Sequence, residues 1–410
     1  MTVAPTRVAG FRCAVCGALV DVATALSWRC PNATAGDRRH ALQIVGGGAA
    51  VPVVDDVVDP TNPFLSFRPA LAWDAFAGAA GMTERARIAL IEETDAAVAA
   101  VDGVGFRWTP FARSDGLSDA LGFTATGGVW IKDETGNVAG SHKARHLFTI
   151  LLHLLTAERT GQAPWPAAPA EGSRPPLAIA SCGNAALAAA TLAAAAGWPI
   201  RVFVPPSANE RVVARLTTLA AEIVVCPRRA GDPSGAPCVH RFREAVAAGA
   251  VPFSAQGTEN VWCLDGGRTI GWELLSQAES SIDSSGRELD RVIVQVGGGA
   301  FASCIGAALR DVDPGGAPIL HAVQTEGCAP LNRAWDRAVD AAGRRGAATQ
   351  WSRLMWPWDT EPHSVADGIL DDETYDWLGV FDGMLATGGS PVVAPESDVL
   401  EAARLAAEHT

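Results

Sequence analysis

Residues 132–145 read Lys-Asp-Glu-Thr-Gly-Asn-Val-Ala-Gly-Ser-His-Lys-Ala-Arg. This stretch follows an apolar segment at residues 129–131 and leads into an apolar segment that predicts a helix from Ser141. Gly140, before a polar cap, places Lys143 in the first helical turn. There the positive end of the helix dipole and partial burial disfavour an ammonium and favour the neutral, nucleophilic amine. Lys143 is therefore a candidate for Schiff-base chemistry, and the competing interpretation is a helix-start lysine that faces water.

A second strand-to-helix turn lies at residues 178–186, which read Ala-Ile-Ala-Ser-Cys-Gly-Asn-Ala-Ala. Backbone amides at the start of such a helix can hold a carboxylate, and Asn184 offers one donor and one acceptor beside it. The turn is therefore suited to an anion. The alternative is that Asn184 caps the helix and contacts no ligand.

A third turn, at residues 294–303, reads Val-Gln-Val-Gly-Gly-Gly-Ala-Phe-Ala-Ser. The successive glycines let the backbone curl so that several N–H groups point at one phosphate, and the following helix adds its dipole. A dinucleotide-binding fold is the competitor, but Phe301 and Ala302 break the GxGxxG spacing. The loop therefore fits a mononucleotide-like phosphate better.

Apolar strands and Ala-rich helices alternate along the chain from residue 128 onward. The expected strands lie at residues 129–131, 177–180, 200–204, 222–225 and 291–296, and helices are expected to begin at Ser141, Ala185, Asn209 and Phe301. Such alternation predicts βαβ units around mainly parallel sheets, in which ligands bind beyond the carboxyl ends of the strands. The three turns are therefore the places to look for chemistry. A further helix is expected at residues 83–101, with Thr83 as its N-cap.

The composition excludes several classes of protein. A net charge of -13 and the lack of a Lys/Arg-rich run argue against nucleic-acid binding, since the cluster at residues 38–40 is short and follows Asp37. No secretory signal or apolar run of membrane-spanning length is found, so we expect a cytoplasmic protein without a membrane partner. The nine cysteines are then expected to be reduced thiols, metal ligands or core residues.

Four possible metal ligands lie near the N-terminus. Cys13 and Cys16 form a CxxC pair followed by glycine, a turn that lets two thiolates point at one tetrahedral ion. Cys30 and His40 would supply the second pair. We predict a structural zinc site, and the alternative is a degenerate or metal-free cysteine turn.

The three turns together resemble fold-type II pyridoxal-5'-phosphate (PLP) enzymes, the tryptophan-synthase-β type. Gly-Ser-His-Lys at residues 140–143 resembles the Gly-Ser-Phe-Lys of threonine synthases and dehydratases and the Gly-Ala-His-Lys of tryptophan synthase β subunits. The asparagine turn and the glycine loop resemble the other two motifs of the family, in the same order. Residues 204–206 and 264–273 are also similar to stretches of threonine synthases and dehydratases, and the likeness covers roughly residues 109 to 408.

The resemblance implies an α/β fold of two open, mainly parallel domains preceded by a small zinc-ribbon-like unit. The N-terminal unit would span residues 1–45. The large PLP-binding domain would comprise residues 46–139 and 226–410, and the small domain, with the reactive lysine and the asparagine turn, residues 140–225.

The resemblance also implies roles for individual residues. Lys143 would be the Schiff-base lysine and the proton-transfer base, and Asn184 would bind the 3'-oxygen of the cofactor. The substrate carboxylate would be held by Ser181, Cys182 and Gly183, and the phosphate by Gly297, Gly298, Gly299, Ala300 and Phe301. His142 is a further candidate contact to the phosphate.

The implied function is that of a PLP-dependent lyase that acts on an amino acid by elimination or replacement. The cysteine-bearing N-terminus favours a threonine synthase-like enzyme, because many bacterial threonine synthases begin with a zinc-ribbon-like segment. The glycine loop favours a serine/threonine dehydratase or a related ammonia-lyase. A third possibility is a non-catalytic paralogue, since family members usually continue into a strand whose Ser or Thr faces the pyridine nitrogen, whereas this chain ends at Thr410. We further expect a small amino-acid substrate and a homo-oligomer, namely a dimer.

Overall fold

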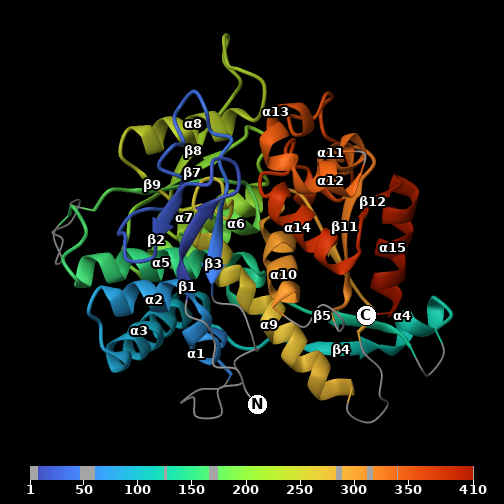
Figure 1. Ribbon diagram of the computed structural model, residues 1–410, viewed down its shortest axis with the longest axis horizontal. Coiled ribbons are helices and arrows are strands. Elements are labelled where there is room, and N and C mark those ends of the chain that lie inside the picture. The colour runs from blue at the N-terminus through green and yellow to red at the C-terminus, as the bar shows by residue number, and fades with distance from the viewer. Residues whose placement is uncertain are drawn as a thin grey trace. The chain divides into compact units, whose positions relative to one another are not determined.

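The computed structural model describes residues 8–46, 61–123, 127–165, 174–282, 289–311, 317–338 and 340–409 (Figure 1). Contacts between Cα atoms divide the chain into two units. Unit 1 comprises Met1–Arg107 and Asn137–Thr269, and unit 2 comprises Trp108–Gly136 and Ile270–Thr410. The three-part division expected from the sequence, with its boundaries after residues 45, 139 and 225, stays a prediction.

Unit 1 begins with a small antiparallel sheet, drawn in dark blue in Figure 1. Its strands are β1 (Val8–Cys13), β2 (Leu19–Asp21) and β3 (Leu42–Gly46), in the order β2-β1-β3. A side chain at Gly10 would lie 2.1 Å from the carbonyl oxygen of Val20, so the close approach of β1 and β2 requires glycine there. The sheet brings Cys13, at the end of β1, near the residues that precede β3.

Short helices follow the N-terminal sheet in unit 1. They are α1 (Pro63–Ser66), the 3-10 turn η1 (Arg68–Ala70), α2 (Ala72–Ala79) and α3 (Glu84–Asp102). The predicted start of α3 is confirmed, because the Thr83 hydroxyl accepts a hydrogen bond from the backbone N–H of Ala86 at 3.2 Å. Gly103, with φ of +90°, ends the helix in the left-handed conformation that favours glycine.

The main sheet of unit 1 is parallel. Its strands are β6 (Leu177–Ala180), β7 (Ile200–Val204), β8 (Glu222–Val225) and β9 (Val251–Pro252), in the order β8-β7-β6-β9. The connecting helices are α6 (Asn184–Ala195), α7 (Glu210–Thr218) and α8 (Pro237–Ala247). This arrangement confirms the βαβ units predicted for residues 177–225, and it places the asparagine turn at the carboxyl end of β6.

Two further helices position the reactive-lysine candidate in unit 1. The 3-10 turn η2 (Val138–Gly140) leads into α5 (Lys143–Arg159), and α9 (Trp262–Ile282) crosses α5 through its first residues. A side chain at Gly266 of α9 would lie 2.0 Å from the carbonyl oxygen of Arg145. Glycine at this position therefore permits the close approach of the two helices.

Unit 2 contains a second parallel sheet. Its strands are β10 (Arg291–Gln295), β11 (Ile319–Thr325) and β12 (Pro391–Ala394), in that order. Its helices are α10 (Ala300–Arg310), α11 (Pro330–Arg337), α12 (Ala341–Arg345), α13 (Trp351–Leu354), α14 (Trp377–Thr387) and α15 (Glu396–His409), with 3-10 turns η3 (Ala347–Gln350) and η4 (Asp367–Ile369). Helices α10 and α14 pack closely, since a side chain at Gly306 would lie 2.8 Å from the Cα atom of Gly383.

One predicted strand has a different partner from the one expected. The sequence predicts that residues 129–131 open the series of βαβ units, but β5 (Val129–Lys132) pairs antiparallel with β4 (Phe111–Ser114). The two strands form a separate sheet of unit 2, connected through α4 (Asp115–Ala120). The short connection explains the antiparallel pairing, because a parallel pair needs a longer crossover.

The described chain thus has a mixed α/β fold with parallel sheets, as expected from the sequence. None of its described helices combines the length and the apolar character needed to cross a lipid bilayer.

Candidate functional site

The turn before Lys143 has an unusual backbone that directs the chain into α5. Ala139 has φ of 54° and Gly140 has φ of 70°, after which Ser141 is extended. The backbone N–H of Ala139 donates to Oδ2 of Asp102 at 2.9 Å, which fastens the turn to the end of α3. The hydroxyl of Ser141 accepts from the backbone N–H of Lys143 at 3.4 Å. Lys143 is therefore the first residue of α5, as predicted from the sequence.

The amine of Lys143 is half-buried and uncommitted. Within the described part of the chain, no hydrogen bond or ion pair reaches its Nζ atom, which lies in a turn shared with His142 and His146. Burial, followed by the nearby positive charge of Lys143, holds the pKa of His142 well below its ordinary value and lowers the pKa of His146 to about 3. Both imidazoles are therefore neutral at physiological pH.

The orientation of His146 is fixed by its surroundings. Its Nδ1 atom donates to the carbonyl oxygen of Cys263 at 2.9 Å, since a carbonyl can only accept. The rings of His142 and His146 meet edge to face, with their centroids 5.4 Å apart. The first turn of α5 thus presents one amine beside two neutral rings.

The chain has only one other lysine, Lys132, and its environment is the opposite. The Nζ atom of Lys132 donates to Oε1 of Glu273 at 2.5 Å, to Oε1 of Gln277 at 2.8 Å and to the carbonyl oxygen of Thr109 at 2.6 Å. The Glu273 side chain is completely buried and also accepts from the backbone N–H of Thr109. Lys132 is therefore held by three acceptors within unit 2, whereas Lys143 is free to react.

The asparagine turn leaves its polar groups open. Gly183 is the N-cap of α6 and Asn184 is its first residue, so the interpretation of Asn184 as a capping residue is wrong. The Asn184 side chain is exposed, and in the regions that the structure describes it makes no hydrogen bond. The hydroxyl of Ser181 accepts from the backbone N–H of Gly183 at 3.4 Å, and Cys182 is exposed. Because α6 packs against α5 and η2, this turn and the Lys143 turn belong to one cluster of helices.

The glycine loop connects β10 to α10 in unit 2, as predicted. Gly299 is the N-cap of α10 with φ of +91°, so this position favours glycine for its backbone conformation alone. Phe301 follows Ala300 in the first turn of the helix. The backbone at the start of α10 can therefore offer N–H groups to an anion.

The segment before α14 packs against this loop, and no motif of the sequence indicates this contact. A Cβ atom at Gly297 would lie 2.7 Å from Oδ2 of Asp371, and one at Gly299 would lie 2.8 Å from Cγ2 of Thr374. The glycines are therefore required by close packing as well as by the backbone. A carboxylate beside a phosphate-binding loop would weaken the binding of a phosphate, because like charges repel.

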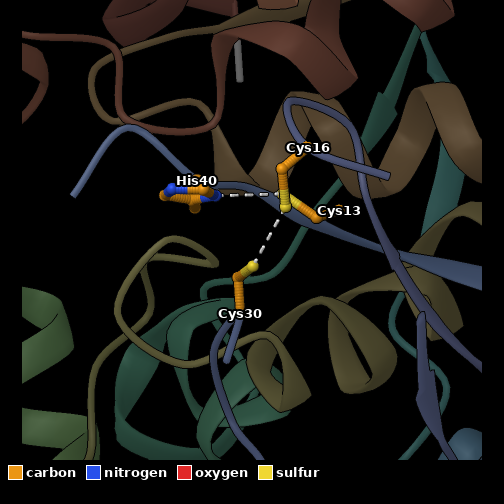
Figure 2. Close-up of side chains that lie close together, drawn as sticks. All are labelled: Cys13, Cys16, Cys30 and His40. Carbon is orange, nitrogen blue, oxygen red and sulfur yellow. Dashed lines mark hydrogen bonds between the residues drawn. The ribbon is translucent and has the colours of Figure 1, made fainter. Parts of the chain in front are cut away.

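The four N-terminal candidate ligands come together, as predicted (Figure 2). The ligand atoms of Cys13, Cys16, Cys30 and His40 all lie within 4.8 Å of one another. Sγ of Cys13 lies 3.4 Å from Nδ1 of His40, and Sγ of Cys16 lies 3.6 Å from Sγ of Cys30. Three sulfur atoms and one imidazole nitrogen form a donor set that suits a tetrahedral zinc ion.

Hydrogen bonds around the cluster tune its thiols. Burial tends to raise the pKa of the Cys16 thiol, but hydrogen bonds from the backbone of Ala18 and from Asn32 outweigh it and lower this pKa to about 6. Burial raises the pKa of Cys30 to about 12. Gly17, with φ of +73°, closes the CxxC turn by donating its N–H to the carbonyl oxygen of Cys13 at 2.9 Å.

Asp37 is an outer partner of this cluster. Its Oδ2 atom lies 3.7 Å from Nε2 of His40, the ring nitrogen that faces away from the thiols. Such a carboxylate orients a metal-bound histidine and increases its basicity. The spacing of three residues between Asp37 and His40 is the signal in the sequence that could have identified it.

Comparisons with known proteins agree with the fold. The family model for pyridoxal-phosphate dependent enzymes matches residues 104–410, which leaves the cysteine cluster outside the match. No curated protein sequence matches this chain significantly.

Solved structures of similar fold include several amino-acid enzymes. Maize serine racemase is 19% identical with a TM-score of 0.55, over 78% of this chain and 80% of its own. Threonine deaminase from T.th. is 20% identical with a TM-score of 0.55, over 77% and 85%. The processed form of threonine deaminase isoform 2 from Solanum lycopersicum is 14% identical with a TM-score of 0.53, over 88% and 83%. At these identities the structures share the fold, and together with the family match they identify this chain as a member of the pyridoxal-phosphate dependent enzyme family.

Proposed function

We propose that this chain is a PLP-dependent lyase that removes or replaces a β- or γ-substituent of a small amino acid. The observation that carries the proposal is the contrast between the two lysines of the chain. Lys132 is held by three acceptors, and the Lys143 amine is half-buried without an ion pair in the described part of the chain. A nucleophilic amine must be able to lose its proton and move, which only Lys143 can do.

Three groups of residues would hold the cofactor. Nζ of Lys143 would attach it covalently, the exposed amide of Asn184 would bind its ring oxygen, and the backbone from Gly297 to Phe301 would bind its phosphate. His142 is a further candidate for the phosphate. When bound, the cofactor supplies an electron sink for the bond that breaks at the substrate Cα atom.

The remaining chemistry belongs to side chains and backbone of this protein. The N–H groups at the start of α6, from Ser181 to Gly183, would hold the substrate carboxylate and thereby orient the Cα–H bond. The amine of Lys143, released by the substrate, would accept the Cα proton. The neutral rings of His142 and His146 add no positive charge beside this amine, so they do not oppose its work as a base.

The leaving group separates the two lyase activities that we consider. The N-terminal cysteine cluster supports a threonine synthase-like enzyme, and the glycine loop supports a serine/threonine dehydratase or a related ammonia-lyase. Threonine, serine and O-phosphohomoserine should be screened together against the holoenzyme. Release of a 2-oxo acid indicates a dehydratase, and release of phosphate with formation of threonine indicates a synthase.

Other outcomes of the same screen would change the proposal. Loss of optical activity without release of a substituent would indicate a racemase, the activity named for one of the similar structures. If no amino acid alters the cofactor spectrum while PLP stays bound, the chain is a non-catalytic paralogue. The same preparation tests the proposed homodimer by light scattering.

We also propose that Cys13, Cys16, Cys30 and His40 bind one structural zinc ion. Four protein ligands close the coordination sphere, which is typical of structural rather than catalytic zinc. The support is the distance between ligand atoms and the carboxylate of Asp37 behind His40. Metal analysis of the purified protein, with a Cys13→Ser, Cys16→Ser double variant as the control, tests it. A folded protein without zinc would contradict it.

A further inference from the structure

The two loops of the cysteine cluster contact a single segment of unit 1, residues 259–263, which we call the bridging segment. The loop between Cys16 and Cys30 supplies Trp28, whose carbonyl oxygen accepts from the backbone N–H of Val261 at 2.8 Å. The Trp28 ring also meets the Trp262 ring edge on, with centroids 5.7 Å apart at 86°. This loop is therefore attached to the bridging segment by its backbone and by its one aromatic ring.

The second loop, between Cys30 and His40, contacts the same segment through a charge. The guanidinium of Arg38 lies 3.5 Å from Oε2 of Glu259. Glu259 is 3% exposed, and its other oxygen lies 2.7 Å from Arg243. A buried carboxylate held between two guanidiniums fixes the place of the loop, since the loss of either partner leaves a poorly compensated charge.

The bridging segment in turn contacts one face of α5. The carbonyl oxygen of Cys263 accepts from His146, and that of Trp262 accepts from the hydroxyl of Thr149 at 2.7 Å. The Trp262 ring stacks on the His153 ring, with centroids 4.3 Å apart and an interplanar angle of 6°. Residues 146, 149 and 153 lie on the same side of a helix, and this helix begins at Lys143.

We propose that metal bound to the cysteine cluster holds the bridging segment against α5, so that loss of the metal loosens the helix that carries Lys143. The metal closes both loops, and without it nothing covalent or coordinate joins Cys13, Cys16, Cys30 and His40. Trp28 and Arg38 then lose the frame that keeps them on the bridging segment. The inference rests on the proposed zinc site and is independent of the reaction assigned to Lys143.

Hydrogen exchange measured by mass spectrometry on the full chain tests this coupling. Zinc is removed with a chelator and then restored, and the exchange of α5 peptides is compared with that of α14 peptides from unit 2. We expect removal to speed the exchange of α5 by about tenfold or more and zinc to reverse it, because local opening sets the exchange rate. Exchange in α14 should not change. Equal exchange of α5 with and without zinc, or a protein that binds no zinc, overturns the inference.

Variants of Trp28 separate the coupling from metal binding itself. Trp28→Ala keeps all four ligands, so we expect one zinc per chain but fast exchange of α5 even when zinc is bound. Trp28→Phe keeps an aromatic edge on Trp262 and should preserve the protection, which shows that the site tolerates substitution. Leu19→Ala, at a 73% exposed position of the N-terminal sheet, is the matched control and should behave like the wild type. Full protection of α5 in zinc-loaded Trp28→Ala overturns the inference.

These outcomes are distinct from a failure of the proposed reaction. Exchange of α5 is measured without substrate and does not depend on which lysine holds the cofactor. A chain that binds PLP on Lys143 yet shows no metal-dependent exchange would retain its proposed function and lose the coupling.

Discussion

The Nζ atom of Lys132 lies 2.5 Å from Oε1 of Glu273, a carboxylate with no exposed surface. Removing the cation would leave this carboxylate buried with only neutral donors, at a cost of about 3–5 kcal/mol. We therefore expect Lys132→Met to lower the free energy of unfolding by several kcal/mol in urea denaturation. The protein should still attach PLP at Lys143 under native conditions.

An exposed ion pair serves as the control for this variant. Arg404→Gln removes the pairs of Arg404 with Glu401 and Glu408 on the surface of α15, and such pairs contribute about 1 kcal/mol or less. A Lys132→Met variant as stable as Arg404→Gln would show that the buried pair is replaceable. It would also remove the argument that Lys132 is committed.

The carboxylate of Asp37 is expected to strengthen metal binding through His40. We expect Asp37→Asn to weaken zinc binding by about 10- to 100-fold, because an outer carboxylate orients the imidazole and increases its basicity. Competition with a chromophoric chelator measures the change. Asp21→Asn, at an exposed aspartate of β2, should leave zinc affinity unaltered, and equal affinity in both variants would exclude the role of Asp37.

Acid should destabilise the protein partly through His153. This ring lies between Trp262 and Phe76, no hydrogen bond reaches either of its nitrogens in the described residues, and burial lowers its pKa from 6.5 to about 3. Below pH 6.5 the unfolded chain therefore binds a proton that the folded chain does not, so the free energy of unfolding falls as the pH drops toward 3.

Replacing this histidine should flatten the pH dependence. Relative to the wild type, His153→Leu should reduce the slope of unfolding free energy by up to about 1.4 kcal/mol per pH unit between about pH 6 and pH 4. Urea denaturation across this interval measures it. The exposed His409→Gln control should keep the wild-type slope, and a His153→Leu slope identical to the wild type would contradict the assignment.

The negative charge of Asp371 should oppose the binding of a phosphate to the glycine loop. Its Oδ2 atom lies 2.7 Å from where a Cβ atom of Gly297 would be. We expect Asp371→Asn to tighten PLP binding by about three- to tenfold at low salt, with a smaller gain at high salt, because salt screens charges that water can reach. Equilibrium titration with PLP measures this change, with Asp367→Asn as the control at a nearby exposed aspartate. Weaker binding in Asp371→Asn would show that the carboxylate helps to shape the loop.

Local features of the sequence predict much of the fold. The strands at residues 177–180, 200–204 and 222–225 are predicted correctly because buried parallel strands are apolar throughout. Thr83 is recognisable as the N-cap of α3 from its own side-chain chemistry. The cysteine cluster is predictable for a similar reason, since its CxxC turn is formed within a few residues.

Contacts between distant residues are beyond the reach of the sequence. Lys132 and Glu273 are 141 positions apart, and neither sits in a motif that announces the other. The antiparallel pairing of β5 escapes prediction for the same reason, because residues 129–131 resemble a buried strand whichever partner they have. Asp371 near the glycine loop and Trp28 on Trp262 likewise arise from tertiary packing and leave no local pattern.

The most direct test of the central claim is to find which lysine holds the cofactor. The purified protein is reduced with borohydride, digested and mapped by mass spectrometry, and only Lys132 and Lys143 are possible sites in this chain. We predict a pyridoxyl group on Lys143 alone, and its absence from Lys143→Ala. A pyridoxyl group on Lys132, or none on either lysine in protein saturated with PLP, would contradict the account.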